Sequence, residues 1–218
     1  MIERQLKYGA GYATVAFDEK HLLAELLPNQ VEIGLTGVDE VKRSLAEPIG
    51  SAPLSELAVG KRNVVIITSD ITRPCPSFKI IPSLLDELGK AGVADDQITV
   101  VLAVGSHRTH TDEEKKHLVG EEVFSRVRCL DSDVNDCVHL GTTRAGTPVD
   151  IFRPVAEADL KICVGNIEFH YFAGYSGGAK AIMPGVSTRD AIQANHSRMV
   201  LPECCAGALE TNPLRMDI

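Results

Sequence analysis

The segment NVVIITSD, residues 63–70, decides the fold that this sequence predicts. Its four consecutive apolar residues are followed directly by polar ones, which is typical of a strand buried on both faces of a parallel sheet. A second run of this kind, QITVVLAVG, occupies residues 97–105. Between the two runs, FKIIPSLLDELGKAG (78–92) has the apolar spacing of a helix, and Gly92 is a natural end for it. This order of strand, helix and strand predicts a parallel unit.

The same alternation continues along the chain. We expect a helix over 111–120, where Thr111 and Glu114 have the spacing of a capping box. Further elements are expected as strands at 12–18, 31–35, 126–131, 148–152 and 159–165, and as helices at 39–46, at 187–201 and from Asn212 onward. The order of these elements predicts an α/β fold with a mainly parallel sheet and helices on both faces, a Rossmann-like arrangement.

The composition argues against several classes of protein. A net charge of -8, 5% aromatic residues and the absence of tryptophan argue against a nucleic-acid partner, because they provide neither a basic patch nor a stacking surface. The N-terminal residues lack the apolar centre of a signal peptide, and no apolar run is long enough to span a membrane. The six cysteines form no CxxC pair, so we expect reduced thiols and a cytoplasmic protein.

Three polar loops follow predicted strands, at residues 69–77, 105–111 and 165–180. Because ligands of parallel sheets bind beyond the carboxyl ends of the strands, we expect the three loops to meet at one crevice. In the first loop, the carboxylate of Asp70 could accept hydrogen bonds from ribose hydroxyls, and Arg73 could bind a carboxylate or a phosphate. A local ion pair between these two residues, worth under about 1 kcal/mol, is the structural alternative.

The second loop places His107 directly after a strand and beside Arg108. A histidine next to an arginine suits acid–base work on an anionic substrate. His107 and His110 are three residues apart, so a zinc site is another interpretation, although no cysteine or third histidine stands at a ligand spacing. A structural role for His107 in capping the loop is the third interpretation.

The third loop contains HYFAGYSGGAK, residues 170–180. Its glycines could let backbone N–H groups approach an anion near Lys180, although the spacing is not that of a P-loop. GYSGG also fits the G-x-S-x-G turn of serine hydrolases, with Ser176 as the nucleophile. The preceding strand is expected to end roughly ten residues too early for that turn. A glycine-rich turn with a surface lysine is the structural alternative.

Four segments taken together resemble the nickel-dependent lactate racemase family: SDITRP, GSHR, HYFAGYSGGAKAIMPGVS and NHSR. The resemblance runs over most of the chain from about residue 45 to residue 218. It implies a cofactor, the nickel-pincer nucleotide (Ni(II)-pyridinium-3,5-bisthiocarboxylate mononucleotide), in which two sulfurs and one carbon hold nickel. It also implies an isomerase, a racemase or epimerase of a 2-hydroxy acid that works by hydride transfer to and from this cofactor.

The resemblance implies a role for each matching residue. Lys180 would attach covalently to the cofactor, and His196 would complete the square plane of the nickel. His107 and His170 would be the two catalytic bases. The nucleotide part would be held by the loop formed by Asp70, Ile71, Thr72 and Arg73.

The chemistry of the residues agrees with this resemblance. Racemising a 2-hydroxy acid breaks a C–H bond of low acidity, and a hydride acceptor avoids the unstable carbanion that proton removal would give. Return of the hydride to either face then needs a base on each side, and histidine titrates near neutrality. Imidazole and sulfur donors in a plane suit nickel.

The resemblance also bears on domains and partners. Residues 1–218 would be the N-terminal cofactor-binding domain of a two-domain protein, without the C-terminal domain that closes over the substrate, so the isolated chain is expected to lack activity. The expected partners are a small 2-hydroxy acid and the proteins that synthesise the cofactor. A chain produced in a host without those proteins is expected to be empty. A non-catalytic module that binds a nucleotide or phosphate is the main alternative function.

Overall fold

The computed structural model describes all of residues 1–218, which form two compact units, Met1–Gly34 and Leu35–Ile218. The first unit is an antiparallel hairpin of β1 (Ile2–Tyr8) and β2 (Gly11–Phe17), followed by a short 3-10 helix, η1 (Glu19–His21). The predicted strand at 12–18 is therefore confirmed as β2. The strand predicted at 31–35 is wrong, because these residues are exposed and have no neighbouring strand to supply hydrogen bonds.

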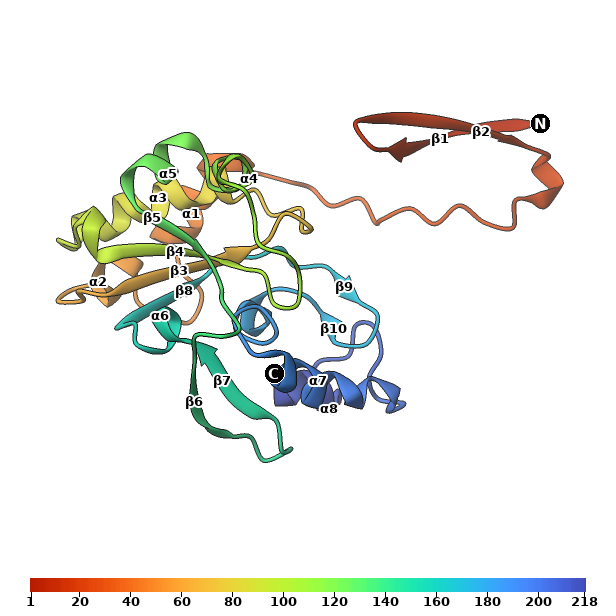
Figure 1. Cartoon of the computed structure of the whole chain (residues 1–218). Coiled ribbons are helices and arrows are strands. Elements are labelled where there is room, and N and C mark those ends of the chain that lie inside the picture. The colour runs from red at the N-terminus through yellow and green to blue at the C-terminus, as the bar shows by residue number, and fades with distance from the viewer. The chain divides into compact units, whose positions relative to one another are not determined.

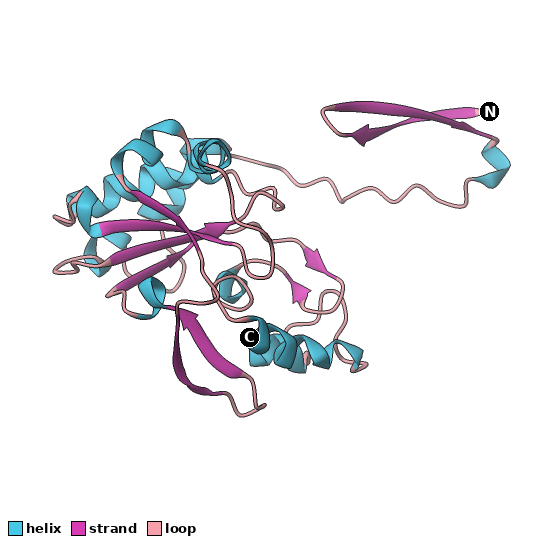
Figure 2. Ribbon diagram, in the orientation of Figure 1, coloured by secondary structure: helices cyan, strands magenta, loops and turns pink.

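A four-stranded parallel sheet forms the centre of the second unit, with the order β5-β4-β3-β8 (Figures 1 and 2). Its strands are β3 (Val64–Ser69), β4 (Ile98–Ala103), β5 (Arg128–Asp131) and β8 (Leu160–Cys163). The fold-deciding segment is β3, which pairs with β4 on one side and β8 on the other. All four apolar residues of β3, Val64 to Ile67, are fully buried, as expected of a central strand that is covered on both faces.

Helices cover one face of this sheet, as Figure 1 shows. They are α1 (Gly37–Ala46), α2 (Leu54–Leu57), α3 (Ser77–Lys90), α4 (Asp112–Val119) and α5 (Glu121–Arg126). Ile66 and Val100 of the sheet pack with Ile81, Leu85 and Leu88 of α3 in one buried cluster. The capping box predicted for α4 is present, since Thr111 accepts from the Glu114 N–H and Glu114 accepts from the Thr111 N–H.

The opposite face is covered by shorter elements. Val65, Ile67 and Val101 pack against β7 (Pro148–Phe152), α6 (Arg153–Ala156) and the segment that contains Val186. The strand β7 forms an antiparallel hairpin with β6 (Cys137–Thr142). The predicted α/β fold with a parallel sheet is confirmed.

The last third of the unit is built from short pieces at the carboxyl edge of the sheet. These are β9 (Phe169–His170), β10 (Gly174–Tyr175), η3 (Gly178–Ala181), α7 (Arg189–His196), η4 (Ser197–Val200) and α8 (Pro213–Asp217). The side chain of Thr188 caps α7, and that of Asn212 caps α8. The helix predicted at 187–201 is shorter than expected, because α7 ends at His196 and continues as the 3-10 turn η4. No helix of the structure combines the length and the apolar character that crossing a bilayer requires.

Candidate functional site

A pocket of about 320 Å³ lies at the carboxyl ends of β3, β4 and β8. All three loops singled out in the sequence contribute to its lining, as the strand order requires. Six of the predicted site residues line it together: Asp70, Arg73, His107, His170, Lys180 and His196. Ile71 and Thr72 belong to the same loop as Asp70 but are not part of the lining.

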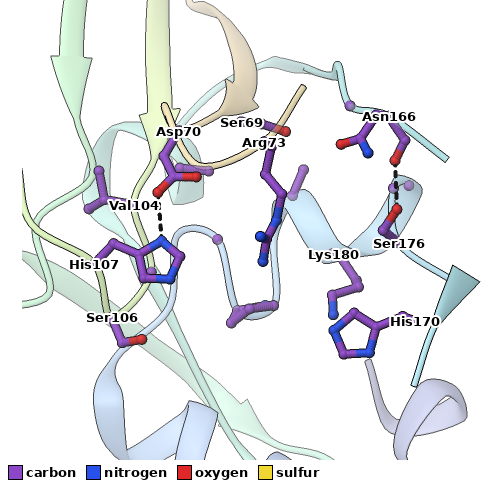
Figure 3. Close-up of a pocket in the computed structure, with 18 of the residues that line it drawn as sticks. Ser69, Asp70, Arg73, Val104, Ser106, His107, Asn166, His170, Ser176 and Lys180 are labelled. Carbon is purple, nitrogen blue, oxygen red and sulfur yellow. Dashed lines mark hydrogen bonds and ion pairs between the residues drawn. The ribbon is translucent and has the colours of Figure 1, made fainter. Parts of the chain in front are cut away.

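The carboxylate of Asp70 is held against the imidazole of His107 (Figure 3). Oδ2 of Asp70 lies 2.6 Å from Nδ1 of His107, and Oδ1 accepts a hydrogen bond from the Thr72 hydroxyl at 2.7 Å. A carboxylate at this distance fixes the proton of the neutral imidazole on Nδ1. The Nε2 lone pair of His107 is therefore free to accept a proton at the pocket. The ion pair with Arg73 that the sequence allowed does not form, since these partners engage Asp70 instead.

His170 has the opposite arrangement of its two nitrogens. Its Nδ1 accepts the N–H of Ala173 at 3.2 Å, so the neutral ring carries its proton on Nε2. Burial, and then the positive charges of Lys180 and Arg73, lower the pKa of His170 from 6.5 to about 4. At neutral pH this imidazole is uncharged and presents an N–H donor.

Lys180 lies on the same side of the pocket as His170, and Arg73 projects between this pair and His107 (Figure 3). Burial, and then the charges of Arg73 and Arg215, lower the pKa of Lys180 from 10.5 to about 8. A substantial fraction of the amine is consequently neutral at mildly alkaline pH, which makes it a better nucleophile than an ordinary lysine.

A glycine beside Lys180 allows a close approach of two loop segments. Gly177 has a φ of 74°, and a Cβ at this position would lie 2.9 Å from the backbone oxygen of Asn166. Only glycine fits this contact without displacing the backbone. The third loop can therefore fold back on itself and present Lys180 to the pocket.

His196 stands at the C-terminal end of α7, where Asn195 orients it. Its Nδ1 lies 3.1 Å from Oδ1 of Asn195, whose Nδ2 donates to the Leu214 carbonyl and to Asp217 at 3.2 and 2.8 Å. Because the Asn195 amide donates to these oxygens, its Oδ1 is the acceptor and His196 is the donor. Burial, and then the charge of Lys180, lower the pKa of His196. The result is a neutral imidazole with a free Nε2, the form that binds metals.

The serine hydrolase interpretation finds no support at Ser176. This side chain is buried, its hydroxyl donates to the Asn166 carbonyl at 2.8 Å, and it accepts the Glu168 N–H at 3.0 Å. Both partners are backbone groups, so the hydroxyl holds the loop together and has no imidazole base. The zinc interpretation also fails, because His107 faces Asp70 whereas His110 faces Asp131.

Two residues that organise the site, Asn195 and Asp217, were missed in the sequence, and His110 was considered there only as a zinc ligand. Asn195 lies in the NHSR segment directly before His196, and this adjacency was the available signal. Nothing in the local pattern around Asp217 or His110 indicates their partners, which lie far away along the chain.

Comparisons with known proteins identify the family of the chain. Two curated lactate racemases are similar to the chain. The enzyme of Thermoanaerobacterium thermosaccharolyticum is 38% identical over 192 residues, covering 86% of this chain and 45% of its own length. That of Lactiplantibacillus plantarum is 36% identical over 225 aligned positions, covering 100% of this chain and 53% of its own length. The chain thus spans about half the length of the curated relatives that it matches.

Two solved structures have the same fold as the chain. The lactate racemase apoprotein from T. thermosaccharolyticum superposes with a TM-score of 0.86 at 35% identity, over 99% of this chain and 52% of that one. A structural-genomics protein from Thermotoga maritima has the same fold, with a TM-score of 0.64 at 22% identity over 82% of this chain and 45% of that one. The family model of the lactate racemase N-terminal domain matches residues 8–206, and the chain belongs to this family.

Proposed function

We propose that this chain is the cofactor-binding part of a racemase or epimerase that acts on a small 2-hydroxy acid such as lactate. The observation that carries the proposal is the pair of imidazoles on opposite sides of one pocket, with Lys180 and Arg73 also in its lining (Figure 3). The relatives named lactate racemase support the same reaction class. The remaining half of the relatives' length would close the pocket over the substrate.

The cofactor we propose is the nickel-pincer nucleotide, and the pocket has groups that fit it. The lowered pKa of Lys180 would supply a neutral amine that condenses with a thiocarboxylic acid group of the cofactor, forming a thioamide and releasing water. The oriented Nε2 of His196 would be the one ligand that the protein gives to nickel. The structure contains no cluster of three or more His, Cys, Asp or Glu side chains able to hold a metal, and the proposal does not require one. When bound, the cofactor would accept and return the hydride of the substrate.

Arg73 and the loop that carries it would bind anionic groups. Its guanidinium projects into the pocket beside Lys180, and it stays positively charged after the amine of Lys180 has reacted with the cofactor (Figure 3). The carboxylate of the substrate and the phosphate of the nucleotide are the anions that this reaction would bring there. The loop from Asp70 through Ile71 and Thr72 to Arg73 would thereby hold the nucleotide part, as the family resemblance implies.

The two histidines would handle the hydroxyl proton of the substrate. Nε2 of His107 is already free to accept it, because Asp70 holds the other nitrogen in its protonated form. His170 can act as a base only after the hydrogen bond from the Ala173 N–H to its Nδ1 is broken. A shift of the ring proton from Nε2 to Nδ1 would break the same bond, because Nδ1 would no longer be an acceptor. The Ala173 bond is long, at 3.2 Å, but its loss leaves the buried Ala173 N–H without a partner, which costs about 1–3 kcal/mol.

The test of this proposal uses protein coexpressed with the cofactor-biosynthesis proteins, which we propose as its partners in the cytoplasm. His107→Ala and His170→Ala should each slow racemisation by about 10²–10⁴-fold while cofactor and nickel remain bound. With substrate deuterated at C2, the label should remain at C2 in both enantiomers, because a returned hydride does not exchange with water. Because the isolated chain is expected to lack activity, turnover is measured in protein that includes the C-terminal domain of the family. Bound cofactor without turnover in that wild-type protein would instead favour the non-catalytic nucleotide-binding module.

A further inference from the structure

His110 is a buried histidine that the proposed chemistry does not use. It ends the loop after β4, and its side chain is 1% exposed. Each ring nitrogen has one hydrogen-bond partner, and the two partners belong to different parts of the sheet's carboxyl edge. Nδ1 lies 2.6 Å from Oδ1 of Asp131 at the end of β5, and Nε2 accepts the backbone N–H of Ile71 at 3.1 Å. His110 therefore links the loop after β3 to the end of β5.

These contacts determine the tautomer of His110. The Ile71 N–H is a donor, so Nε2 must carry the lone pair and Nδ1 the proton. Asp131 accepts a hydrogen bond from the Nδ1–H of His110, and it also accepts one from the backbone N–H of His110 at 2.9 Å. Nζ of Lys115 lies 3.8 Å from the same carboxylate. The ring is thus held at both nitrogens, and the backbone of the same residue is held by a third hydrogen bond.

The bond to Ile71 reaches the pocket through the chain itself. Ile71 directly follows Asp70, the residue whose carboxylate orients His107, and precedes Arg73 by two positions. Ile71 is an exposed loop residue, and the bond from its N–H to His110 anchors the loop to the body of the domain. Loss of this anchor would free Asp70 to move away from His107.

We propose that His110 is a positioning residue, which holds the loop after β3 so that Asp70 fixes the tautomer of His107. The physical basis is that a buried imidazole with two hydrogen bonds is a rigid acceptor for the Ile71 N–H. A water molecule at the surface would not hold this N–H in one position. The effect on catalysis rests on the proposed function, whereas the effect on the tautomer of His107 does not.

Two substitutions separate this role from general stability. In His110→Gln, the side-chain Oε1 can take the place of Nε2 and accept from Ile71, but the bond to Asp131 is lost. In His110→Asn, Nδ2 can take the place of Nδ1 and donate to Asp131, but the bond to Ile71 is lost. The bond to the Asp131 carboxylate that His110→Gln loses is the stronger of the two, so this variant is expected to be the less stable one although it keeps the tautomer of His107.

The readout is the tautomer of His107 in the chain labelled with ¹⁵N-histidine, observed through the ¹⁵N shifts of its ring. The wild type and His110→Gln should show His107 protonated on Nδ1. His110→Asn should lose this form in favour of the Nε2-protonated tautomer that a free imidazole prefers. If both variants keep the wild-type tautomer, or both lose it equally, the proposal is wrong.

A measurement on the wild type covers the case in which a variant does not fold. The Ile71 amide should exchange with solvent much more slowly than an unprotected amide, because its partner is buried. Exchange at the unprotected rate would overturn the proposal. In the cofactor-loaded protein, His110→Asn should lower kcat by about 10–100-fold with little change in KM, whereas His110→Gln should stay within a few-fold of wild type. A wild-type protein that includes the C-terminal domain and binds cofactor but does not turn over would refute the proposed function and leave the tautomer result standing.

Discussion

Asp70 and His107 come from the loops after two neighbouring strands, and their side chains meet at 2.6 Å at the mouth of the pocket. The carboxylate side chain is 4% exposed, whereas the imidazole is 44% exposed. A nearly buried carboxylate therefore determines which ring nitrogen of the more exposed His107 carries the proton. The same relationship is absent on the other side, where His170 is held by a backbone N–H. The two imidazoles are therefore not equivalent: the proton of His107 is on Nδ1, whereas that of His170 is on Nε2.

Replacing Asp70 by asparagine should impair the base at His107. The amide of the introduced side chain would be able to donate to Nδ1, which moves the imidazole proton to Nε2 and removes the lone pair from the pocket. In the cofactor-loaded protein we expect kcat to fall by about 10²–10⁴-fold. Asp112→Asn is the control, because it makes the same chemical change at a carboxylate that is 71% exposed and lies outside the pocket. A near-normal kcat in Asp70→Asn would show that the carboxylate does not set the base.

Lys180 should react with amine reagents at unusually low pH. With a pKa of about 8, its acetylation rate should reach half of the maximum near pH 8, while the same peptide in the denatured chain should require a pH near 10.5. Peptide-resolved mass spectrometry measures both rates in one experiment. Arg73→Gln should move the midpoint upward, because removing a positive charge favours the protonated amine. Identical profiles in the native and denatured chain would contradict the lowered pKa.

His170 should remain neutral well below pH 6.5. Its imidazole resonances should titrate near pH 4 in NMR spectra of the chain, and Lys180→Met should raise this midpoint because a nearby positive charge is lost. Between pH 6.5 and 4 the unfolded chain binds a proton that the folded His170 does not. The free energy of unfolding should consequently decrease as the pH falls through this window. Titration at or above pH 6.5 would mean that the ring is not desolvated.

Asp217 should be a main support of the helix that carries His196. Its carboxylate side chain is 1% exposed and accepts from Thr143 at 2.6 Å, Asn195 at 2.8 Å and Arg198 at 3.1 Å. Burial raises the pKa of Asp217, but the hydrogen bonds and the charge of Arg198 together outweigh burial, so the pKa in the folded chain is below its ordinary value. The ionised carboxylate therefore stabilises the fold above the ordinary pKa, and this stabilisation is lost as the pH falls through the lowered pKa. We expect Asp217→Asn to reduce the free energy of unfolding by about 2–4 kcal/mol at pH 7.

Urea unfolding of Asp217→Asn measures this loss. The exposed Glu210 provides the control, since Glu210→Gln removes a charge from the same region without removing a buried partner. Equal stability of the two variants would show that the network around Asp217 contributes no net stability.

The sheet could be predicted from the sequence because its signal is local. The buried runs of β3 and β4 identify themselves by continuous apolar residues, and Thr111 with Glu114 identifies the start of α4. Once the strands are parallel, the edge at which the polar loops meet follows from topology alone. This is why the sequence alone predicts that residues of three distant loops line one pocket.

The contacts that orient those residues could not be predicted in the same way. Nδ1 of His107 pairs with Asp70 and not with a nearer acidic residue, and Asn195 takes its orientation from α8, about twenty residues further along the chain. Such pairings depend on how loops cross, which apolar spacing does not encode. The strand predicted at 31–35 fails for a related reason, because alternation alone does not supply a partner strand.

The mass of the Lys180 peptide after coexpression with the cofactor-biosynthesis proteins shows whether this lysine attaches the cofactor. We expect an adduct of the nucleotide on Lys180, with about one nickel per chain, and we expect Lys180→Ala to abolish the adduct. A loaded preparation in which the cofactor is attached elsewhere, or in which Lys180 remains unmodified while nickel is bound, would contradict attachment at Lys180.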